Sequence, residues 1–192
     1  SADVVNLVAD KIKQYGITNV VLDPVMVSTS GHRLIEENEI EHIKKCLMPL
    51  VRVITPNIPE AEILTGCKIV GEQDFNNIAR KLSNNGNISV LLKAGHLDGD
   101  TLVDYFYNAE NDSLTLLPSK RVNTQNTHGT GCTLSAAFAA ALARGESLTT
   151  AAKSAKHFID QAIISGANVG IGHGHGPVNH FFNPSKMLIN DI

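Results

Sequence analysis

A glycine-rich turn that leads directly into an alanine-rich stretch is the feature of this sequence with the clearest chemical meaning. The turn reads Gly129-Thr130-Gly131-Cys132, and alanine dominates residues 136–143. Alanine favours helix and glycine disfavours it, so the pattern predicts a helix that begins at the turn. The first N–H groups of a helix have no partner inside it and carry partial positive charge, and glycine lets a ligand approach the backbone. The turn therefore predicts an anion site, with phosphate as the usual anion.

Cys132 lies in the first turn of this predicted helix, where the helix field favours a thiolate over a thiol. A reactive group beside a phosphate site indicates phosphoryl transfer. The structural alternative is a tight connection with no ligand, because a short glycine motif is a weak signal by itself. The rest of the chain has to decide between these interpretations.

Three short apolar runs, at residues 20–22, 51–54 and 89–92, have the pattern of strands in a parallel sheet that is covered on both faces. The polar residues that follow them are Asp23, then Asn57 and Glu60, and finally Lys93. Ligands bind at the carboxyl ends of the strands in an open parallel sheet, so we expect these side chains and the anion site to share one crevice. Two carboxylates, an ammonium group and a helix start suit Mg²⁺ with a nucleotide. Lys93 would offset charge on the transferred phosphoryl group.

Each of these residues also has a structural explanation. Asp23 fits a turn, and Glu60 fits the first turn of a helix, where carboxylates are favoured. Lys93 follows four apolar residues and is harder to explain in this way, because lysine is seldom buried without a purpose. Lys156 lies in a helical pattern and, considered alone, fits a solvated helix face.

The elements that would position these residues alternate between helix and strand. Helical patterns at about 4–12, 36–47 and 73–82 precede the three strands, and a short helix begins at Pro59. The alternation predicts a parallel sheet flanked by helices. Apolar runs at 102–107 and 114–117 then flank a polar turn and predict a small antiparallel hairpin at one side of the sheet, and a last helix is expected at 147–164. The predicted fold class is α/β.

Composition narrows the class of protein. The chain has 192 residues, of which 43% are hydrophobic and 18% charged, and this predicts one globular domain over residues 1–192. Net charge is −3 and lysine and arginine do not cluster, so we expect no nucleic-acid partner. No apolar run is long enough to span a membrane, and we expect no signal peptide. Three cysteines without a CxxC pair fit a reducing cytoplasm.

A glycine-rich segment near the end of the chain, residues 170–180, contains His173, His175 and His180. Such a cluster invites a metal-site interpretation. Alternating glycines, and the lack of an interleaved cysteine or carboxylate, argue against it. We expect instead a glycine loop that closes over the edge of the sheet.

Four motifs occur in one order along the chain, at 23–27, 55–60, 91–97 and 128–135. They read Asp-Pro-Val-Met-Val, Thr-Pro-Asn-Ile-Pro-Glu, Leu-Leu-Lys-Ala-Gly-His-Leu and His-Gly-Thr-Gly-Cys-Thr-Leu-Ser. Together they resemble the hydroxymethylpyrimidine/phosphomethylpyrimidine kinases of thiamine biosynthesis, members of the ribokinase-like superfamily. The Gly-His-Gly-His-Gly-Pro-Val-Asn-His tail is also typical of that family. Most ribokinase-like enzymes carry aspartate at the position of Cys132.

The resemblance implies an enzyme that uses ATP and Mg²⁺ to phosphorylate 4-amino-5-hydroxymethyl-2-methylpyrimidine and then its monophosphate. It also implies a homodimer. The resemblance implies that Cys132 is the catalytic base and that Gly129, Thr130 and Gly131 form the anion hole. It implies that Asn57 and Glu60 are the N-x-x-E motif that organises Mg²⁺ and phosphate, and that Asp23 and Lys93 lie around the ATP phosphates, with Asp23 and Glu60 toward the metal. It also implies that Lys156 lies on the nucleotide side and that the Val25 backbone contacts the pyrimidine.

The chain departs from the family pattern at its start. Family members begin with a strand and the sequence Gly-Ser-Asp-x-x-Gly-Gly-Ala-Gly-Ile-Gln, which forms much of the pyrimidine pocket and is not found here. We therefore expect residues 1–192 to be N-terminally incomplete, to bind the pyrimidine poorly and to leave strand edges unpaired. Two alternatives stay open: a pyridoxal-type kinase of the same superfamily, and a non-catalytic module that binds a nucleotide or a vitamin precursor.

Overall fold

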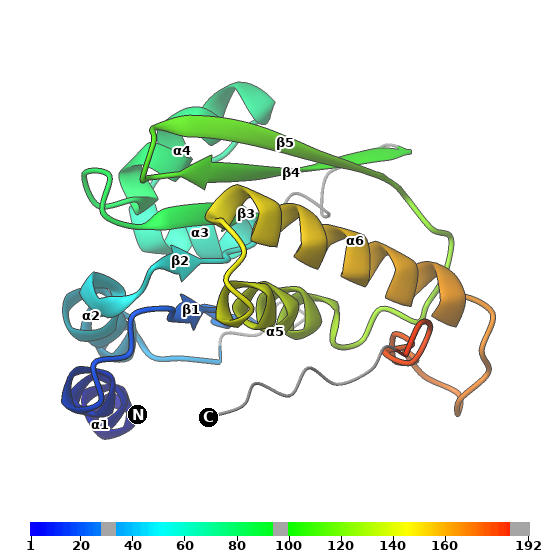
Figure 1. Ribbon diagram of the computed structural model, residues 1–192, viewed down its shortest axis with the longest axis horizontal. Coiled ribbons are helices and arrows are strands. Elements are labelled where there is room, and N and C mark those ends of the chain that lie inside the picture. Colours follow the sequence, from blue (N-terminus) through cyan, green and yellow to red (C-terminus); the bar gives the residue numbers. More distant parts are fainter. Residues whose placement is uncertain (28–33, 94–99, 185–192) are drawn as a thin grey trace.

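A five-stranded sheet with strand order β1-β2-β3-β4-β5 forms the centre of the molecule in the computed structural model, which describes residues 1–27, 34–93 and 100–184 (Figure 1). The strands β1 (Val21–Leu22), β2 (Val53–Ile54) and β3 (Ser89–Leu92) are parallel. The strands β4 (Thr101–Asn108) and β5 (Ser113–Lys120) form an antiparallel hairpin that continues the sheet from β3. The predicted α/β class, with parallel strands and a hairpin at one side, is confirmed.

Helices cover both faces of this sheet, as Figure 1 shows. In chain order the helices and helical turns are α1 (Ala2–Gln14), α2 (Glu37–His42), η1 (Ile43–Leu47), η2 (Met48–Leu50), α3 (Ile58–Thr65), η3 (Glu72–Asp74), α4 (Phe75–Leu82), α5 (Thr130–Ala143) and α6 (Leu148–Gly166). Helices α5 and α6 pack together on one face, and the other helices lie on the opposite face or at the β1 end. Of the described helices, none has both the length and the apolar content needed to cross a membrane.

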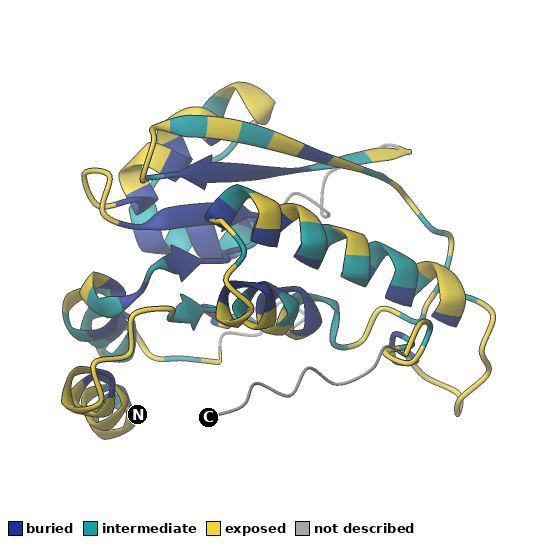
Figure 2. Ribbon diagram, in the orientation of Figure 1, coloured by how far each residue is buried: buried dark blue, intermediate teal, exposed yellow. Residues whose placement is uncertain are grey.

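The strands divide their side chains between two apolar clusters, one on each face of the sheet. Val90 and Leu92 join the cluster with α3 and α4, whereas Leu91 joins the cluster with α5 and α6. This alternation follows from the two-residue period of a strand. Because β3 is buried on both faces, the continuous apolar run at 89–92 has the meaning that the sequence predicted (Figure 2).

Two parts of the predicted architecture differ in the structure. The helical pattern at 36–47 becomes a short α-helix and a π-helical turn, and a 3-10 turn follows it over Met48–Leu50, where Pro49 lacks the N–H group that would continue an α-helix. The prediction that residues 20–22 are buried on both faces is wrong. The β1 strand is only half-buried, because among the described residues no strand pairs with its outer edge.

Candidate active site at the strand ends

An ion pair joins the ends of two parallel strands. Asp23 follows β1 and Lys93 follows β3, and the Lys93 Nζ atom donates to Asp23 Oδ1 over 2.9 Å. Both side chains are largely buried, with 14% of Lys93 and 15% of Asp23 exposed. The topology requires this meeting, since β1, β2 and β3 are parallel neighbours whose carboxyl ends share one edge of the sheet. The prediction that Asp23 and Lys93 meet is confirmed, and the turn explanation of Asp23 alone is insufficient.

The start of α5 lies directly over this ion pair. A Cβ atom added to Gly131 would lie 3.2 Å from Lys93 Nζ and 3.9 Å from Asp23 Oδ2. Gly129, at the helix N-cap, has a φ of 85°, the left-handed conformation that glycine adopts without strain. Cys132 is the next residue in the helix and is exposed. The glycine turn therefore begins a helix, as predicted, and brings it against the two charged strand ends.

The amides at this helix start are partly used within the protein. The N–H of Thr130 donates to the Thr127 carbonyl and the N–H of Thr133 donates to the Gly129 carbonyl. In the part of the chain that the structure describes, the N–H groups of Gly131 and Cys132 form no backbone hydrogen bond. Free amides at a helix start can hold an anion, and the positive end of the helix dipole favours its charge.

A chain of hydroxyl groups connects the strand ends to the helix. The Thr55 hydroxyl donates to Asp23 Oδ1 over 3.1 Å and lies 2.8 Å from the Ser135 oxygen. The Ser135 hydroxyl lies 3.0 Å from the carbonyl oxygen of Gly131 and donates to it. Thr55 is fully buried and Ser135 nearly so. These contacts fix the glycine turn relative to Asp23, and a role for Ser135 was missed because a serine inside an alanine-rich helix gives no signal in the sequence.

Glu60 and Asn57 cap the start of α3 beside the ion pair. The backbone N–H of Asn57 donates to Glu60 Oε2 over 2.8 Å, and the backbone N–H of Glu60 donates to Asn57 Oδ1 over 2.9 Å. This capping box confirms the structural explanation of Glu60. The Asn57 backbone also forms an isolated parallel bridge with Lys93, which places the start of α3 next to the ion pair.

The charge of Glu60 is costly where it lies. Only 2% of this residue is exposed, and burial raises the pKa of its carboxyl above the ordinary value of 4.5. The hydrogen bond from the Asn57 backbone N–H and the Lys93 ammonium oppose this rise. The negative charge of Asp23 raises it further. A cation bound between Asp23 and Glu60 would therefore relieve both carboxylates.

The residues present fit a magnesium ion. The Asp23 Oδ2 atom is buried and has no hydrogen-bond partner among the described residues, and it lies 3.9 Å from the position that a Cβ atom at residue 131 would take. Carboxylate oxygens are ligands that Mg²⁺ prefers, and it commonly takes only one or two of them together with phosphate oxygens and water. Among the residues described, no three acidic, histidine or cysteine side chains are grouped to form a closed metal site, so phosphate oxygens and water would complete the coordination.

Lys156 does not lie on a solvated helix face, and that interpretation is wrong. Its Nζ atom lies 3.0 Å from Asp104 Oδ2 and 3.1 Å from Asp160 Oδ1, and it donates to Ser119 Oγ over 2.8 Å. Only 12% of the Lys156 side chain is exposed. Burial lowers its pKa, but the two carboxylates outweigh burial and raise it overall. The cluster ties α6 to the β4–β5 hairpin.

Sequence reasoning missed the partners of Lys156. The spacing of Lys156 and Asp160 is that of neighbours on one face of a helix, which is a usable signal. Asp104 gives a second signal, because it is the one charged residue in the run 102–107, whose other members are aliphatic or aromatic. Val25, the predicted substrate contact, lies next to Asp23 with 42% of its surface exposed. Residues 94–97 of the third motif lie outside the described residues.

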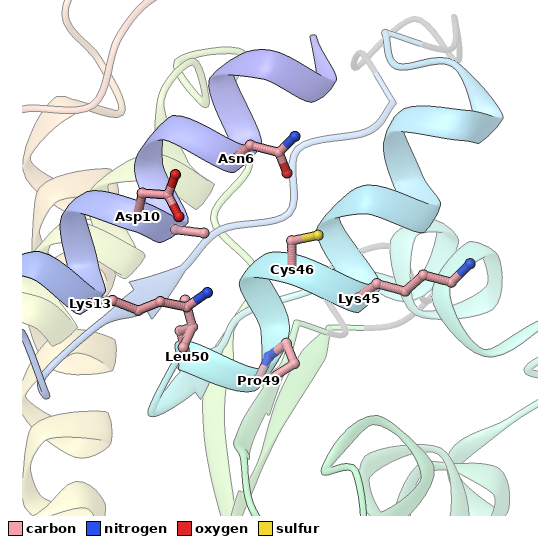
Figure 3. Close-up of a pocket in the computed structure, with 8 residues that line it drawn as sticks. Asn6, Asp10, Lys13, Lys45, Cys46, Pro49 and Leu50 are labelled. Carbon is pink, nitrogen blue, oxygen red and sulfur yellow. The ribbon is translucent and has the colours of Figure 1, made fainter.

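A cavity of about 480 Å³ lies elsewhere, between α1 and the η1–η2 segment (Figure 3). It is lined by Asn6, Ala9, Asp10, Lys13, Lys45, Cys46, Pro49 and Leu50. These side chains mix both signs of charge with apolar atoms, and none is a predicted site residue. The chemistry therefore points to the strand ends rather than to this cavity.

Comparisons with known proteins identify the family of the chain. A family model described as phosphomethylpyrimidine kinase matches residues 1–179. A hydroxymethylpyrimidine/phosphomethylpyrimidine kinase of Rhizobium meliloti is 42% identical over 175 residues, which are 91% of this chain and 65% of that protein. The chain thus spans about two thirds of the length of that relative.

Two solved structures are similar to the fold. A Bacillus subtilis pyridoxal kinase in complex with ADP has a TM-score of 0.83 and 34% identity, over 94% of this chain and 67% of that one. A phosphomethylpyrimidine kinase of Clostridium difficile has a TM-score of 0.72 and 36% identity, over 85% of this chain and 65% of that one.

Replacing Glu60 with glutamine should raise the melting temperature at neutral pH without Mg²⁺. When folding raises the pKa of a carboxyl, the folded protein loses stability as pH rises from 4.5 to the raised pKa. At neutral pH the charge of Glu60 therefore destabilises the fold. The gain should shrink as pH falls through that interval. Thermal unfolding of the wild type and the Glu60→Gln variant between pH 4 and 8 measures the gain in melting temperature, which is expected to be on the order of a few °C at neutral pH.

Glu62→Gln is the matched control, because folding shifts the pKa of Glu62 in the opposite direction. The Ile69 N–H and Lys68 lower the pKa of Glu62, so its charge stabilises the fold above the ordinary pKa. This variant should not gain stability at neutral pH. A Glu60→Gln variant that melts lower than the wild type at neutral pH would contradict the account of Glu60.

Replacing Lys156 with methionine should destabilise the protein by about 3–5 kcal/mol, because it removes the cation from between the buried Asp104 carboxylate and the half-buried Asp160 carboxylate. Lys153→Met in the same helix changes an exposed lysine and should cost little. Chemical denaturation of both variants measures the difference. Equal stability of the two variants would show that the cluster does not hold α6 to the hairpin.

Proposed function

Because the chain belongs to the phosphomethylpyrimidine kinase family, we propose that it transfers the γ-phosphoryl group of ATP to the hydroxymethyl oxygen of 4-amino-5-hydroxymethyl-2-methylpyrimidine and then to the resulting monophosphate. The observation that carries the proposal is the Asp23–Lys93 ion pair beneath Gly131, with the buried Asp23 Oδ2 atom unpartnered within the described part of the chain. An ammonium group, two carboxylates and a glycine helix start form a site for a nucleotide phosphate chain and its magnesium ion.

Each residue of the site has a role in this proposal. The Gly131 and Cys132 amides hold the oxygens of the transferred group, and Lys93 offsets the charge that develops on it. The Cys132 thiolate accepts the proton of the substrate hydroxyl while the bond from that oxygen to phosphorus forms and the bond to the ADP oxygen breaks. Asp23 and Glu60 would hold Mg²⁺, which neutralises charge on the phosphates when it is bound.

Several finer parts of the proposal rest on the family resemblance. Lys156 would lie on the nucleotide side, Val25 would contact the pyrimidine through its backbone, and Asn57 with Glu60 would organise the metal. We also propose one domain over residues 1–192, a homodimer, a cytoplasmic location and no nucleic-acid partner. The three cysteines are free, which fits a reducing compartment.

A pyridoxal kinase is the second candidate, because a pyridoxal kinase has the higher TM-score of the two solved structures, 0.83 against 0.72. Sequence similarity favours the pyrimidine, since the Rhizobium meliloti relative is 42% identical. Fold similarity alone does not fix the substrate.

An ADP-release assay on the full-length protein, with the pyrimidine, its monophosphate and pyridoxal as acceptors, tests the proposal. We expect turnover with the pyrimidine and its monophosphate above that with pyridoxal. Faster turnover of pyridoxal would favour the second candidate. Nucleotide binding without turnover of any acceptor would favour a non-catalytic module.

Replacing Cys132 with alanine should lower kcat by about 10²–10⁴-fold, the usual contribution of a general base, and should change the KM for ATP little. The same ADP-release assay at saturating acceptor measures both constants. Cys46→Ala is the control, because this free cysteine lines the cavity beside α1 and lies outside the site. An unchanged kcat in the Cys132→Ala variant would show that Cys132 is not the base.

A further inference from the structure

Residues 176–180, which we call the strap, run beside the glycine turn that precedes α5. The His128 N–H donates to the Gly176 carbonyl over 3.0 Å, and the Val178 N–H donates to the His128 carbonyl over 3.4 Å. His128 and Pro177 thus form a short parallel bridge, and in Figure 1 this segment lies next to the loop that leads into α5. Val178 is 3% exposed and packs in the apolar cluster of α5 and α6. The strap is therefore part of the packed structure at the helix start.

The strap is also attached to the end of α6. The Asn179 N–H donates to the Ala162 carbonyl over 3.0 Å, and a Cβ atom on Gly166 would lie 3.0 Å from that same nitrogen. On the other side, the Asn126 side-chain amide donates to the Gly166 carbonyl over 2.7 Å. A Cβ atom on Gly176 would overlap the Asn126 side chain, so the strap and the loop before α5 are in close contact. Both sides of the strap are thus fixed by the fold.

His180 at the end of the strap reaches the first turn of α5. Its Nε2 atom lies 2.8 Å from Thr133 Oγ1. Thr133 is only 8% exposed, and its N–H donates to the Gly129 carbonyl over 2.9 Å. His180 is therefore one hydrogen bond away from the residue that closes the glycine turn.

Thr130 restrains this end of the glycine turn locally, because its N–H and its hydroxyl both donate to the Thr127 carbonyl. Gly129 is the N-cap of α5, and no side-chain hydrogen bond caps the helix there. Ser135 holds the Gly131 carbonyl from inside the helix, but that contact acts on the opposite end of the turn. Glycine gives the backbone unusual freedom, so a turn that presents amides to a ligand needs restraint from outside. Thr133 and the strap are placed to supply it.

We propose that His180 is a positioning residue for phosphoryl transfer, and that it acts through Thr133 on the backbone of the glycine turn. The proposal rests on the proposed function. His180 does not touch the reacting atoms; it keeps the Gly131 and Cys132 amides and the Cys132 sulfur at fixed places over Lys93 and Asp23. A misplacement of about 1 Å in such groups can lower the rate by on the order of 10²-fold. A single hydrogen bond that keeps the turn in place can therefore affect kcat.

Two amide substitutions at position 180 test the contact. A glutamine amide reaches about as far as Nε2 of histidine, whereas an asparagine amide reaches only about as far as Nδ1. We expect His180→Asn and His180→Ala to lower kcat by roughly tenfold or more, with the KM for ATP and the melting temperature little changed, and His180→Gln to retain most of the activity. His175→Ala, an exposed histidine of the same segment, is the control and should behave like the wild type.

A double-mutant cycle tests the route through Thr133. Thr133→Val should lower kcat as His180→Ala does, Thr133→Ser should not, and the combined His180→Ala, Thr133→Val variant should lose no more than either single variant. An unchanged kcat in His180→Ala overturns the proposal. So do equal activities of the glutamine and asparagine variants, additive losses in the cycle, or a loss of kcat that only follows the melting temperature.

Hydrogen exchange gives a readout that does not require turnover. The amides of Thr130 and Thr133, which donate to the Thr127 and Gly129 carbonyls, should exchange about tenfold faster in His180→Ala than in the wild type, whereas His175→Ala should leave them unchanged. If the wild type transfers no phosphoryl group, the proposed function fails while this measurement still decides whether His180 restrains the turn. Unchanged exchange in His180→Ala overturns the positioning role.

Discussion

The ion pair between Asp23 and Lys93 is the interaction on which the rest of the site depends. It joins the first and third parallel strands across β2, and the start of α5 lies so close that a Cβ atom at position 131 would be 3.2 Å from the Lys93 amine. Two largely buried charges gain from each other only where geometry and further hydrogen bonds are good. Here Thr55 supplies an additional hydrogen bond to Asp23. The pair therefore fixes both where the helix begins and how close a ligand can come.

The charges around this pair leave an excess of negative charge. Asp23 and Glu60 together carry two negative charges when ionised, and Lys93 carries one positive charge. Glu60 is buried with its pKa raised, and one oxygen of Asp23 has no partner in residues 1–27, 34–93 and 100–184. Buried carboxylates in this state favour an added cation, and the helix start favours an added anion. A magnesium ion together with phosphate satisfies both demands, which neither ion does alone.

The sequence was sufficient for the part of the site that follows from topology. Asp23 and Lys93 were predictable because parallel strands place their carboxyl ends at one edge, and the turn at 129–132 was predictable because glycine and alanine have opposite helix preferences. The Lys156 cluster and the Thr133–His180 contact were not, because their partners come from elements far apart in sequence that only packing brings together. The burial of β1 was also wrongly predicted, since a run of apolar residues does not reveal which strand lies at the edge of the sheet.

A crystal structure of the protein with Mg²⁺ and a non-hydrolysable ATP analogue tests the central claim most directly. The account predicts the terminal phosphates against the amides of Gly131 and Cys132, the Lys93 amine within hydrogen-bond distance of a phosphate oxygen, and Asp23 Oδ2 turned toward the metal. Phosphates bound elsewhere on the molecule, with the Asp23–Lys93 pair unchanged beneath an empty helix start, would contradict it.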